Sequence, residues 1–413
     1  MKLIRVNAAR LQQEIDSLAL ITEAAPPVVT RVLFSESDLR GRAFVKNLCR
    51  EAGLVLREDA VGNIFARWEG ADKTLPAIAT GSHIDAIPNA GKYDGVVGVL
   101  GAIEAIRSLQ AAGFQPKRRI ELIIFTSEEP TRFGIGCLGS RLLGGVLSLE
   151  RAAALRDRAG KDLEFWRTQG GCKGSLDSVK LPRDCYAAFV ELHIEQGPIL
   201  EAENLDIGVV EKIAAPSTLR VLLTGVGGHA GATLMPGRRD AALAGAEIAL
   251  AVERAATTTG SPDTVGTTGI FRIEPGAVNS VPCQAYLEID LRDTLVKTRD
   301  AALHQIEAAV KEICTRRKIE FTIERLNLDP PAICDAKLVE TVVGVVSKLN
   351  FSVKKMISRA YHDSLFMAQV CPTTMIFIPC HKGYSHRPDE FSSPAQIEKG
   401  VRVLAETFAE LAR

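Results

Sequence analysis

The sequence predicts an α/β protein in which a larger domain, built on a mixed central sheet, is interrupted by a smaller inserted domain. Three observations lead to this prediction. The chain has 413 residues, which exceeds a typical single domain of roughly 150 residues. Strand and helix patterns alternate near the N-terminus, and a different order of elements fills the middle of the chain. We expect residues 1–213 and 329–413 to form the larger domain and residues 214–328 to form the inserted one.

The larger domain begins its α/β pattern between residues 75 and 125. Residues 75–79 and 120–125 are short apolar runs that end in polar clusters, as buried strands do. Between them, residues 94–110 repeat valine, leucine and isoleucine at helical spacing. Open α/β sheets bind ligands at the carboxyl ends of their strands, because the loops there gather side chains from several elements. Residues 80–94 and 126–136 are therefore the first places to look for chemistry.

The inserted domain follows a β-α-β-β-α-β order. Its predicted elements are strands at 219–224, 266–273, 284–291 and 319–325, and helices at 239–255 and 301–317. Such a unit makes a four-stranded antiparallel sheet with both helices on one face, which leaves the other face or an edge for another subunit. Pro330 and Pro331 end it, and the α/β pattern resumes with a helix at 339–349 and a strand at 374–378.

The composition excludes several classes of protein. Apolar residues make up 46% and charged residues 24%, as in globular proteins and unlike disordered, collagenous or coiled-coil chains. Fifty basic residues balance fifty acidic ones, so nucleic acid and anionic membranes are not expected partners. The start of the chain has no apolar segment typical of a signal peptide, and the nine scattered cysteines form no C-x-x-C pair. We expect a cytoplasmic protein with reduced thiols, or one of the endoplasmic reticulum if a signal has been removed.

Three of the seven histidines lie in polar, glycine-rich turns beside acidic residues. They are His83, His193 and His386, and each by itself is as compatible with a structural histidine as with a ligand. Asp94 and the pair Glu128–Glu129 lie at the ends of the strand-helix-strand unit. Three imidazoles and two carboxylates are the ligands that two divalent cations need when one carboxylate bridges them.

The adjacent glutamates divide naturally between two roles. Successive residues of an extended chain point in opposite directions, so one of them can ligate a cation while the other remains free. A free glutamate beside a water acidified by a metal ion is a general base. A solvated acidic turn is the other interpretation of the same pair.

Several motifs together resemble the dinuclear-metal amidohydrolases of the aminoacylase/carboxypeptidase-like superfamily. They are His83-x-Asp85, Gly91–Gly95, Glu128–Glu129, His193–Gly197 and Gly228–Gly231. The segment His-Ile-Glu-Gln-Gly is similar to the ureido-cleaving branch, which includes allantoate amidohydrolases, N-carbamoyl-L-amino-acid hydrolases and β-ureidopropionases. The resemblance covers almost the whole chain. It implies a catalytic α/β domain with an inserted dimerisation or lid domain.

The resemblance also implies roles for individual residues. One ion would be held by His83 and His193, the other by Glu129 and His386, with Asp94 bridging them. Glu128 would be the general base. Asp85 would orient the imidazole of His83 by accepting its remaining N–H.

The inserted domain would complete the site of a neighbouring subunit in a homodimer. By resemblance, His229 of the partner subunit would stabilise the tetrahedral oxyanion. Asn279 and Arg292 would bind the amide and the carboxylate of the substrate, because an arginine fork suits a carboxylate. A surface ion pair is the other interpretation of Arg292.

The segment from Ser358 to Ser364 carries the information on substrate. Carbamoylases and allantoate amidohydrolases usually have glycine where Tyr361 stands, and a tyrosine fills that space and adds a hydroxyl. This resembles the ureidoglycolate amidohydrolases, as do residues 24–31 and 377–386. Gln196 would be a further contact to the ureido group. His362, with Asp363, would contact the substrate or support the Tyr361 loop.

The implied reaction is hydrolysis of the terminal ureido amide of (S)-ureidoglycolate to glyoxylate, ammonia and carbon dioxide, the last step of purine nitrogen recovery. The family prefers manganese, and imidazole and carboxylate ligands leave zinc and cobalt open. Allantoate and N-carbamoyl-L-amino acids are the alternative substrates. A non-catalytic dimer that kept the fold is the alternative from another class.

Overall fold

The computed structural model describes residues 3–413, whose contacts divide into two compact units. Unit 1 comprises Met1–Glu211, Ile333–Met356 and His362–Arg413, and unit 2 comprises Lys212–Ala332 and Ile357–Tyr361. The segment Ile357–Tyr361 thus groups with unit 2, whereas the boundaries expected from sequence assign it to the larger domain. Each unit has a hydrophobic core of its own.

Unit 1 is built on a nine-stranded sheet of order β15-β8-β17-β7-β4-β6-β3-β2, with β16 paired to β8. The strands are β2 (Val55–Glu58), β3 (Ile64–Trp68), β4 (Ala77–His83), β6 (Ile120–Phe125), β7 (Tyr186–Ile194), β8 (Ile207–Ile213), β15 (Ala332–Ile333), β16 (Val353–Ser358) and β17 (Thr373–Ile378). Strands β17, β7, β4 and β6 run parallel, whereas β8, β3 and β2 pair antiparallel. The predicted mixed central sheet is confirmed. A separate pair is formed by β1 (Val29–Arg31) and β5 (Ala86–Ala90).

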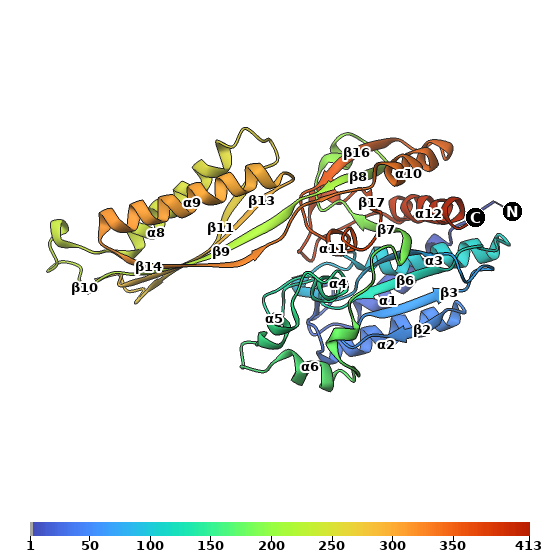
Figure 1. Cartoon of the computed structure of the whole chain (residues 1–413), viewed down its shortest axis with the longest axis horizontal. Helices are drawn as coiled ribbons and strands as arrows, with labels where there is room; N and C mark the ends of the chain where they lie inside the picture. The colour runs from blue at the N-terminus through green and yellow to red at the C-terminus, as the bar shows by residue number, and fades with distance from the viewer. Residues whose placement is uncertain (1–2) are drawn as a thin grey trace. The chain divides into compact units, whose positions relative to one another are not determined.

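Helices pack on both faces of this sheet (Figure 1). They are α1 (Ala8–Ala19), α2 (Glu36–Glu51), α3 (Val96–Ala111), α4 (Leu138–Leu143), α5 (Leu149–Ala154), α6 (Leu163–Gln169), α7 (Ile199–Ala202), α10 (Ala336–Lys348), α11 (Asp363–Met367) and α12 (Pro394–Leu411). Helices α3 and α12 cover one face, and α4 and α11 cover the other. Because it is buried between the sheet and α12, α3 is apolar almost all round.

The register of the parallel strands brings the polar turns together. His83 of β4 is paired with Phe125 of β6, and Ile194 of β7 with Ile378 of β17. The carboxyl ends of these four strands therefore lie at one edge of the sheet. This edge carries the motifs that the sequence singled out, as expected for an open α/β sheet.

Unit 2 contains a four-stranded antiparallel sheet of order β11-β13-β9-β14. Its elements are β9 (Ala215–Thr224), β10 (Gly228–His229), α8 (Ala241–Thr257), β11 (Val265–Glu274), β12 (Ser280–Val281), β13 (Gln284–Asp293), α9 (Val296–Arg317) and β14 (Glu320–Leu328). Both long helices lie on one face of the sheet, and alternate residues of β9 and β13 form the core beneath them (Figure 1). The small β10–β12 pair is an addition that the sequence did not predict.

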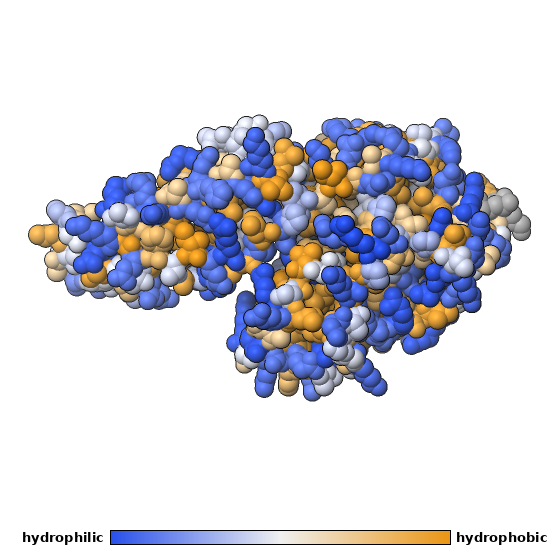
Figure 2. Space-filling view, viewed as in Figure 1, coloured by the Kyte–Doolittle hydropathy of each residue, from blue (hydrophilic) through white to orange (hydrophobic). Residues whose placement is uncertain are grey.

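Exposed apolar side chains lie among polar ones at the β10 end of unit 2 (Figure 2). The segments beside β10 and β12 expose Leu234, Met235 and Val278, the last of them fully. Apolar patches of this kind often mark a surface that another chain covers. Within the described residues, no helix is long and apolar enough to cross a bilayer.

Candidate active site

The candidate site lies in unit 1, at the carboxyl edge of the parallel strands. His83 is the last residue of β4, and His193 lies near the end of β7. Asp94 precedes α3, Glu128–Glu129 follow β6, and His386 follows β17. All are buried except His386, whose side chain is 50% exposed. Segments far apart in the sequence thus contribute to one cluster.

Asp94 lies between two groups of potential metal ligands. Its Oδ1 is 3.5 Å from Nε2 of His83 and 3.2 Å from Nε2 of His193. Its Oδ2 is 3.4 Å from Nε2 of His386, which lies 3.4 Å from Oε1 of Glu129. Within each group the ligand atoms lie within 4.8 Å of one another. One carboxylate therefore faces two ligand sets, with one oxygen toward each.

Gly95 allows the Asp94 loop to approach the imidazoles. Its φ of 65° lies in the left-handed region, and a Cβ there would lie 2.4 Å from Nε2 of His83. Its amide nitrogen is 3.2 Å from Nε2 of His193. Any side chain at this position would displace a ring from the cluster.

The imidazole rings are oriented by backbone carbonyls. Nδ1 of His83 lies 3.0 Å from the carbonyl oxygen of Asp85, and Nδ1 of His193 lies 2.9 Å from that of Ile194. A neutral ring that donates from Nδ1 has its lone pair on Nε2, which is the atom that faces Asp94. Both rings are therefore arranged as ligands.

The carboxylate of Asp85 has a different main partner from the one expected. Its oxygens accept hydrogen bonds from the amides of Glu128, at 3.2 Å, and Glu129, at 3.1 Å. The carboxylate oxygen Oδ1 of Asp85 lies 3.6 Å from Nδ1 of His83. The backbone carbonyl oxygen of Asp85 is closer to the same nitrogen, at 3.0 Å. Asp85 thus orients the ring mainly through its backbone, and its side chain fixes the glutamate turn.

The charges of the cluster suit bound cations. Burial and then repulsion from Asp94 raise the pKa of Glu129 to about 7. Burial raises the pKa of Glu128 well above its usual range, with further repulsion from Glu129. Burial opposes ionisation of Asp94, yet its interactions with the three neighbouring histidines hold its pKa well below the usual value. Buried carboxylates that crowd one another are stabilised by positive charge, so this donor set fits two divalent cations.

Glu128 lies beside the ligands without belonging to either set. Its Oε2 is 3.9 Å from Nε2 of His83, and its Oε1 is 3.4 Å from the thiol sulfur of Cys137. Glu129, its neighbour, faces His386 instead. The two glutamates are directed differently, which leaves Glu128 available for proton transfer.

Gln196 presents an acceptor beside the cluster. Its Nε2 donates to Oδ2 of Asp94 at 2.7 Å and to the hydroxyl of Ser385 at 3.1 Å. These two hydrogen bonds identify the amide nitrogen and therefore the position of the amide oxygen. Its Oε1 is buried and has no hydrogen-bond partner among the described residues. A substrate N–H would supply the missing donor.

A further buried carboxylate, Glu191, escaped the sequence interpretation. It accepts hydrogen bonds from Ser82 and Ser364, and it forms a third potential ligand group with His193 and His362. The ring centroids of His193 and His362 are 4.5 Å apart. The sequence does contain a signal for Glu191, which is a glutamate inside an otherwise apolar strand. A buried charge needs a specific partner, so such a residue indicates a polar contact inside the fold.

Four predicted site residues belong to unit 2 and are described by themselves. His229 of β10 pairs with Ser280 of β12, and Ala230 donates to the carbonyl of Asn279 at 2.8 Å, so His229 and Asn279 are neighbours. Arg292 of β13 binds Asp290, as the ion-pair interpretation expects. Its guanidinium carbon lies 5.6 Å from the centre of the Tyr361 ring.

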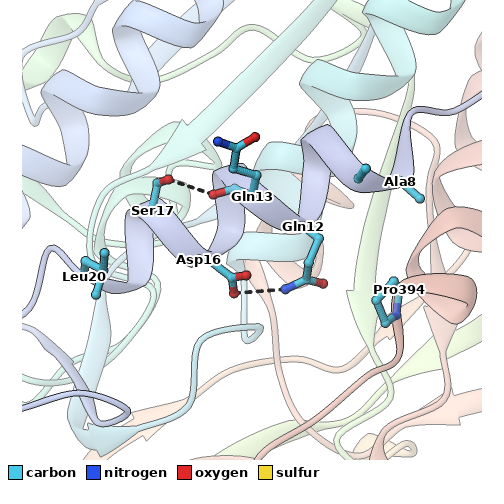
Figure 3. Close-up of a pocket in the computed structure, with 8 residues that line it drawn as sticks. Ala8, Gln12, Gln13, Asp16, Ser17, Leu20 and Pro394 are labelled. Carbon is cyan, nitrogen blue, oxygen red and sulfur yellow. Dashed lines mark hydrogen bonds between the residues drawn. The ribbon is translucent and has the colours of Figure 1, made fainter.

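An open hollow elsewhere on unit 1 lacks such a constellation. It lies along α1 and beside Pro394, and Figure 3 shows hydrogen bonds between Gln12 and Asp16 and between Ser17 and Gln13. Asp16 also pairs with Lys92. The polar groups that line this hollow therefore largely bind to one another.

Comparison with known families identifies the chain. Residues 79–410, which include the whole candidate site, match the model of peptidase family M20/M25/M40. The chain belongs to this family. The resemblance predicted from the motifs is therefore confirmed at the family level. Within M20/M25/M40, the chain is 53% identical to the ureidoglycolate hydrolase of Arabidopsis thaliana, over 99% of this chain and 87% of that protein.

Solved structures agree with this placement in M20/M25/M40. The crystal structures of AtUAH in complex with glyoxylate and with (S)-hydroxyglycine each superpose with a TM-score of 0.93 and 53% identity. Each alignment covers 99% of this chain and 98% of the solved chain. By contrast, the allantoate amidohydrolase of Bacillus subtilis is 34% identical over 96% of this chain.

Proposed function

We propose that the chain hydrolyses the terminal ureido amide of (S)-ureidoglycolate. The observation that carries this proposal is full-length similarity at 53% identity to a ureidoglycolate hydrolase and to AtUAH, which binds (S)-hydroxyglycine and glyoxylate. Water adds to the ureido carbonyl and ammonia leaves. The resulting carbamate loses carbon dioxide to give hydroxyglycine, which releases a second ammonia and becomes glyoxylate. The protein is thus a hydrolase of non-peptide C–N bonds.

The side chains of unit 1 have two different roles in this reaction, cation binding and proton transfer. His83 and His193 would hold one cation and Glu129 and His386 the other, with Asp94 between them. Bound cations supply Lewis acidity at the carbonyl and lower the pKa of a water. Glu128 takes the proton of the attacking water and delivers it to the departing amine nitrogen. This transfer needs a carboxylate outside the ligand sets.

Gln196 positions the ureido group in this mechanism. Its Nε2 is held by Asp94 and Ser385, so its Oε1 is presented as an acceptor for a ureido N–H. We assign His362, whose ring centroid lies 4.5 Å from that of His193, to the same substrate pocket. Manganese is the metal we propose, with zinc and cobalt compatible with the same imidazole and carboxylate donors. Metal analysis of the purified protein decides between them.

A comparison of three substrates tests the reaction. We expect ammonia release with Mn²⁺ to be faster from (S)-ureidoglycolate than from allantoate or an N-carbamoyl-L-amino acid. Replacing Tyr361 by glycine should lower kcat/KM for ureidoglycolate about tenfold, the effect of altering one pocket contact, and raise relative turnover of allantoate. Tyr361→Phe keeps the bulk and removes only the hydroxyl. Faster turnover of allantoate by the unaltered protein would overturn the substrate assignment.

We further propose a homodimer in which His229 of the partner subunit, with its Asn279, completes each site, whereas Arg292 lies beside Tyr361 of its own chain. Support comes from the exposed apolar residues around β10 and from the position of His229 on that strand.

The free thiols of all nine cysteines are compatible with a cytosolic location, which we also propose.

Mixed dimers test the shared site. His229→Ala and Glu128→Gln should each be nearly inactive alone. Refolding them together at equal concentration should restore about a quarter of the activity, because half of the dimers are mixed and each mixed dimer has one intact site. A mixture as inactive as its components, shown by mass to contain mixed dimers, would contradict the proposal. A mixture of Glu128→Gln with a second Glu128→Gln preparation is the control.

A further inference from the structure

A buried carboxylate outside both ligand sets contacts the loop that carries Asp94. Glu390 lies between β17 and α12 and is 4% exposed. Its Oε1 accepts hydrogen bonds from the amides of Tyr93, at 2.9 Å, and Asp94, at 3.0 Å. One oxygen thus holds two consecutive amides, 296 and 297 residues away along the chain.

The second oxygen of Glu390 reaches Asp94 through a hydroxyl. Ser385 Oγ lies 3.0 Å from Oε2 of Glu390 and 2.9 Å from Oδ2 of Asp94. Oδ2 is the oxygen that faces His386 and Glu129. Glu390 therefore contacts the bridging residue twice, at its backbone and, through Ser385, at its side chain.

The loop that carries Asp94 packs closely against the segment that carries Glu390. A Cβ on Gly91 would lie 2.5 Å from Cβ of Glu390 and 2.7 Å from its Oε1. Beside it, the rings of Tyr93 and Phe391 pack edge to face with centroids 5.9 Å apart. Close packing of this kind fixes a side chain in one conformation.

We propose that Glu390 is a positioning residue that sets the direction of the Asp94 carboxylate, so that its two oxygens face two separate cations. The inference rests on the proposed two-cation function. Rotation of Asp94 about its side-chain bonds would turn one oxygen away from one ligand set. Groups that orient metal ligands typically change metal affinity by one to two orders of magnitude when they are removed.

Binding of Mn²⁺ to the full-length protein tests the proposal without relying on activity. Titration calorimetry, or the electron paramagnetic resonance signal of free Mn²⁺, gives the affinity. Glu390→Ala should weaken Mn²⁺ binding about 10–100-fold, as expected for loss of an orienting partner. Glu390→Gln keeps an acceptor for the two amides and should bind Mn²⁺ nearly as tightly as the unaltered protein. Ser385→Ala should weaken binding by a smaller factor.

Asp389→Asn is the matched control, because Asp389 adjoins Glu390 but pairs with Arg387 on the surface. The unfolding temperature of each metal-free variant is measured in parallel. A lower unfolding temperature of Glu390→Ala with unchanged Mn²⁺ affinity would mean that Glu390 only supports the fold, and would overturn the proposal. If Glu390→Ala does not fold, unchanged affinity in Ser385→Ala overturns it.

The wild-type titration separates this inference from the function on which it rests. If the unaltered protein binds no Mn²⁺, Zn²⁺ or Co²⁺, both the proposed function and the positioning role are wrong. If it binds two ions per chain and Glu390→Ala and Ser385→Ala bind them equally well, only the positioning role is wrong.

Discussion

Replacing Glu128 by glutamine is expected to lower kcat for ureidoglycolate by about 10²–10⁴-fold, the usual contribution of a general base. Glutamine keeps the shape of the side chain but cannot accept the proton of the attacking water. Glu128 lies outside the ligand groups, and its neighbour Glu129 faces His386. The number of bound metal ions should therefore remain the same. Steady-state ammonia release and metal analysis on one preparation give both values.

Glu195→Gln is a suitable control for this variant. Glu195 is also a buried glutamate near a strand end, but its oxygens accept hydrogen bonds from the amides of Ile199 and Leu200 at the start of α7. Its replacement should leave kcat largely unchanged. Glu128→Gln with full activity would show that another group takes the proton.

Replacing Asp94 by asparagine is expected to have the second large effect, which acts on both cations. Each carboxylate oxygen faces one ligand set, and asparagine offers one oxygen and one N–H₂ group that cannot ligate. Metal content should fall below two ions per chain. Activity should fall by about 10³-fold, since metal ions contribute several kcal/mol and each 1.36 kcal/mol is a factor of ten.

His386→Ala provides the comparison for Asp94→Asn. His386 lies, with Glu129, only on the Oδ2 side of Asp94. Its loss should therefore release one ion, while the ion held by His83 and His193 stays bound. Inductively coupled plasma mass spectrometry after gel filtration measures both variants. Equal metal content in Asp94→Asn and the unaltered protein would contradict the bridging role.

Local patterns were sufficient to predict the main elements of unit 2 and part of unit 1, whereas strands such as β2, β3 and β8 and the helices α1, α2 and α12 were not assigned. The period of apolar residues identified α3, β6 and the elements of unit 2, because burial of one face imposes that period. Element boundaries were less accurate: α9 begins at Val296, five residues before the predicted start. The β10–β12 pair was missed because two-residue strands have no periodicity.

The types of residue in the candidate site were also predictable, because the histidines and carboxylates cluster in short polar segments at or after strand ends. The sequence placed His83 and His193 in turns, whereas they are residues of β4 and β7. Their mutual geometry was not. The sequence assigned the carboxylate of Asp85 to His83, whereas its closest contacts are the amides of Glu128 and Glu129. Nothing in the sequence near Glu390 indicates a contact with Asp94.

The sequence by itself determined the order of the main elements of unit 2, part of the α/β pattern of unit 1, the family and the chemical groups of the site, since these depend on local periodicity and short motifs. The tertiary structure decided that Asp94 faces two ligand sets, that Gln196 presents an unpaired oxygen and that Glu390 holds the Asp94 loop. These features depend on which strand ends become neighbours and on the close packing of distant loops. Such contacts join residues tens to hundreds of positions apart, where no local pattern reports them.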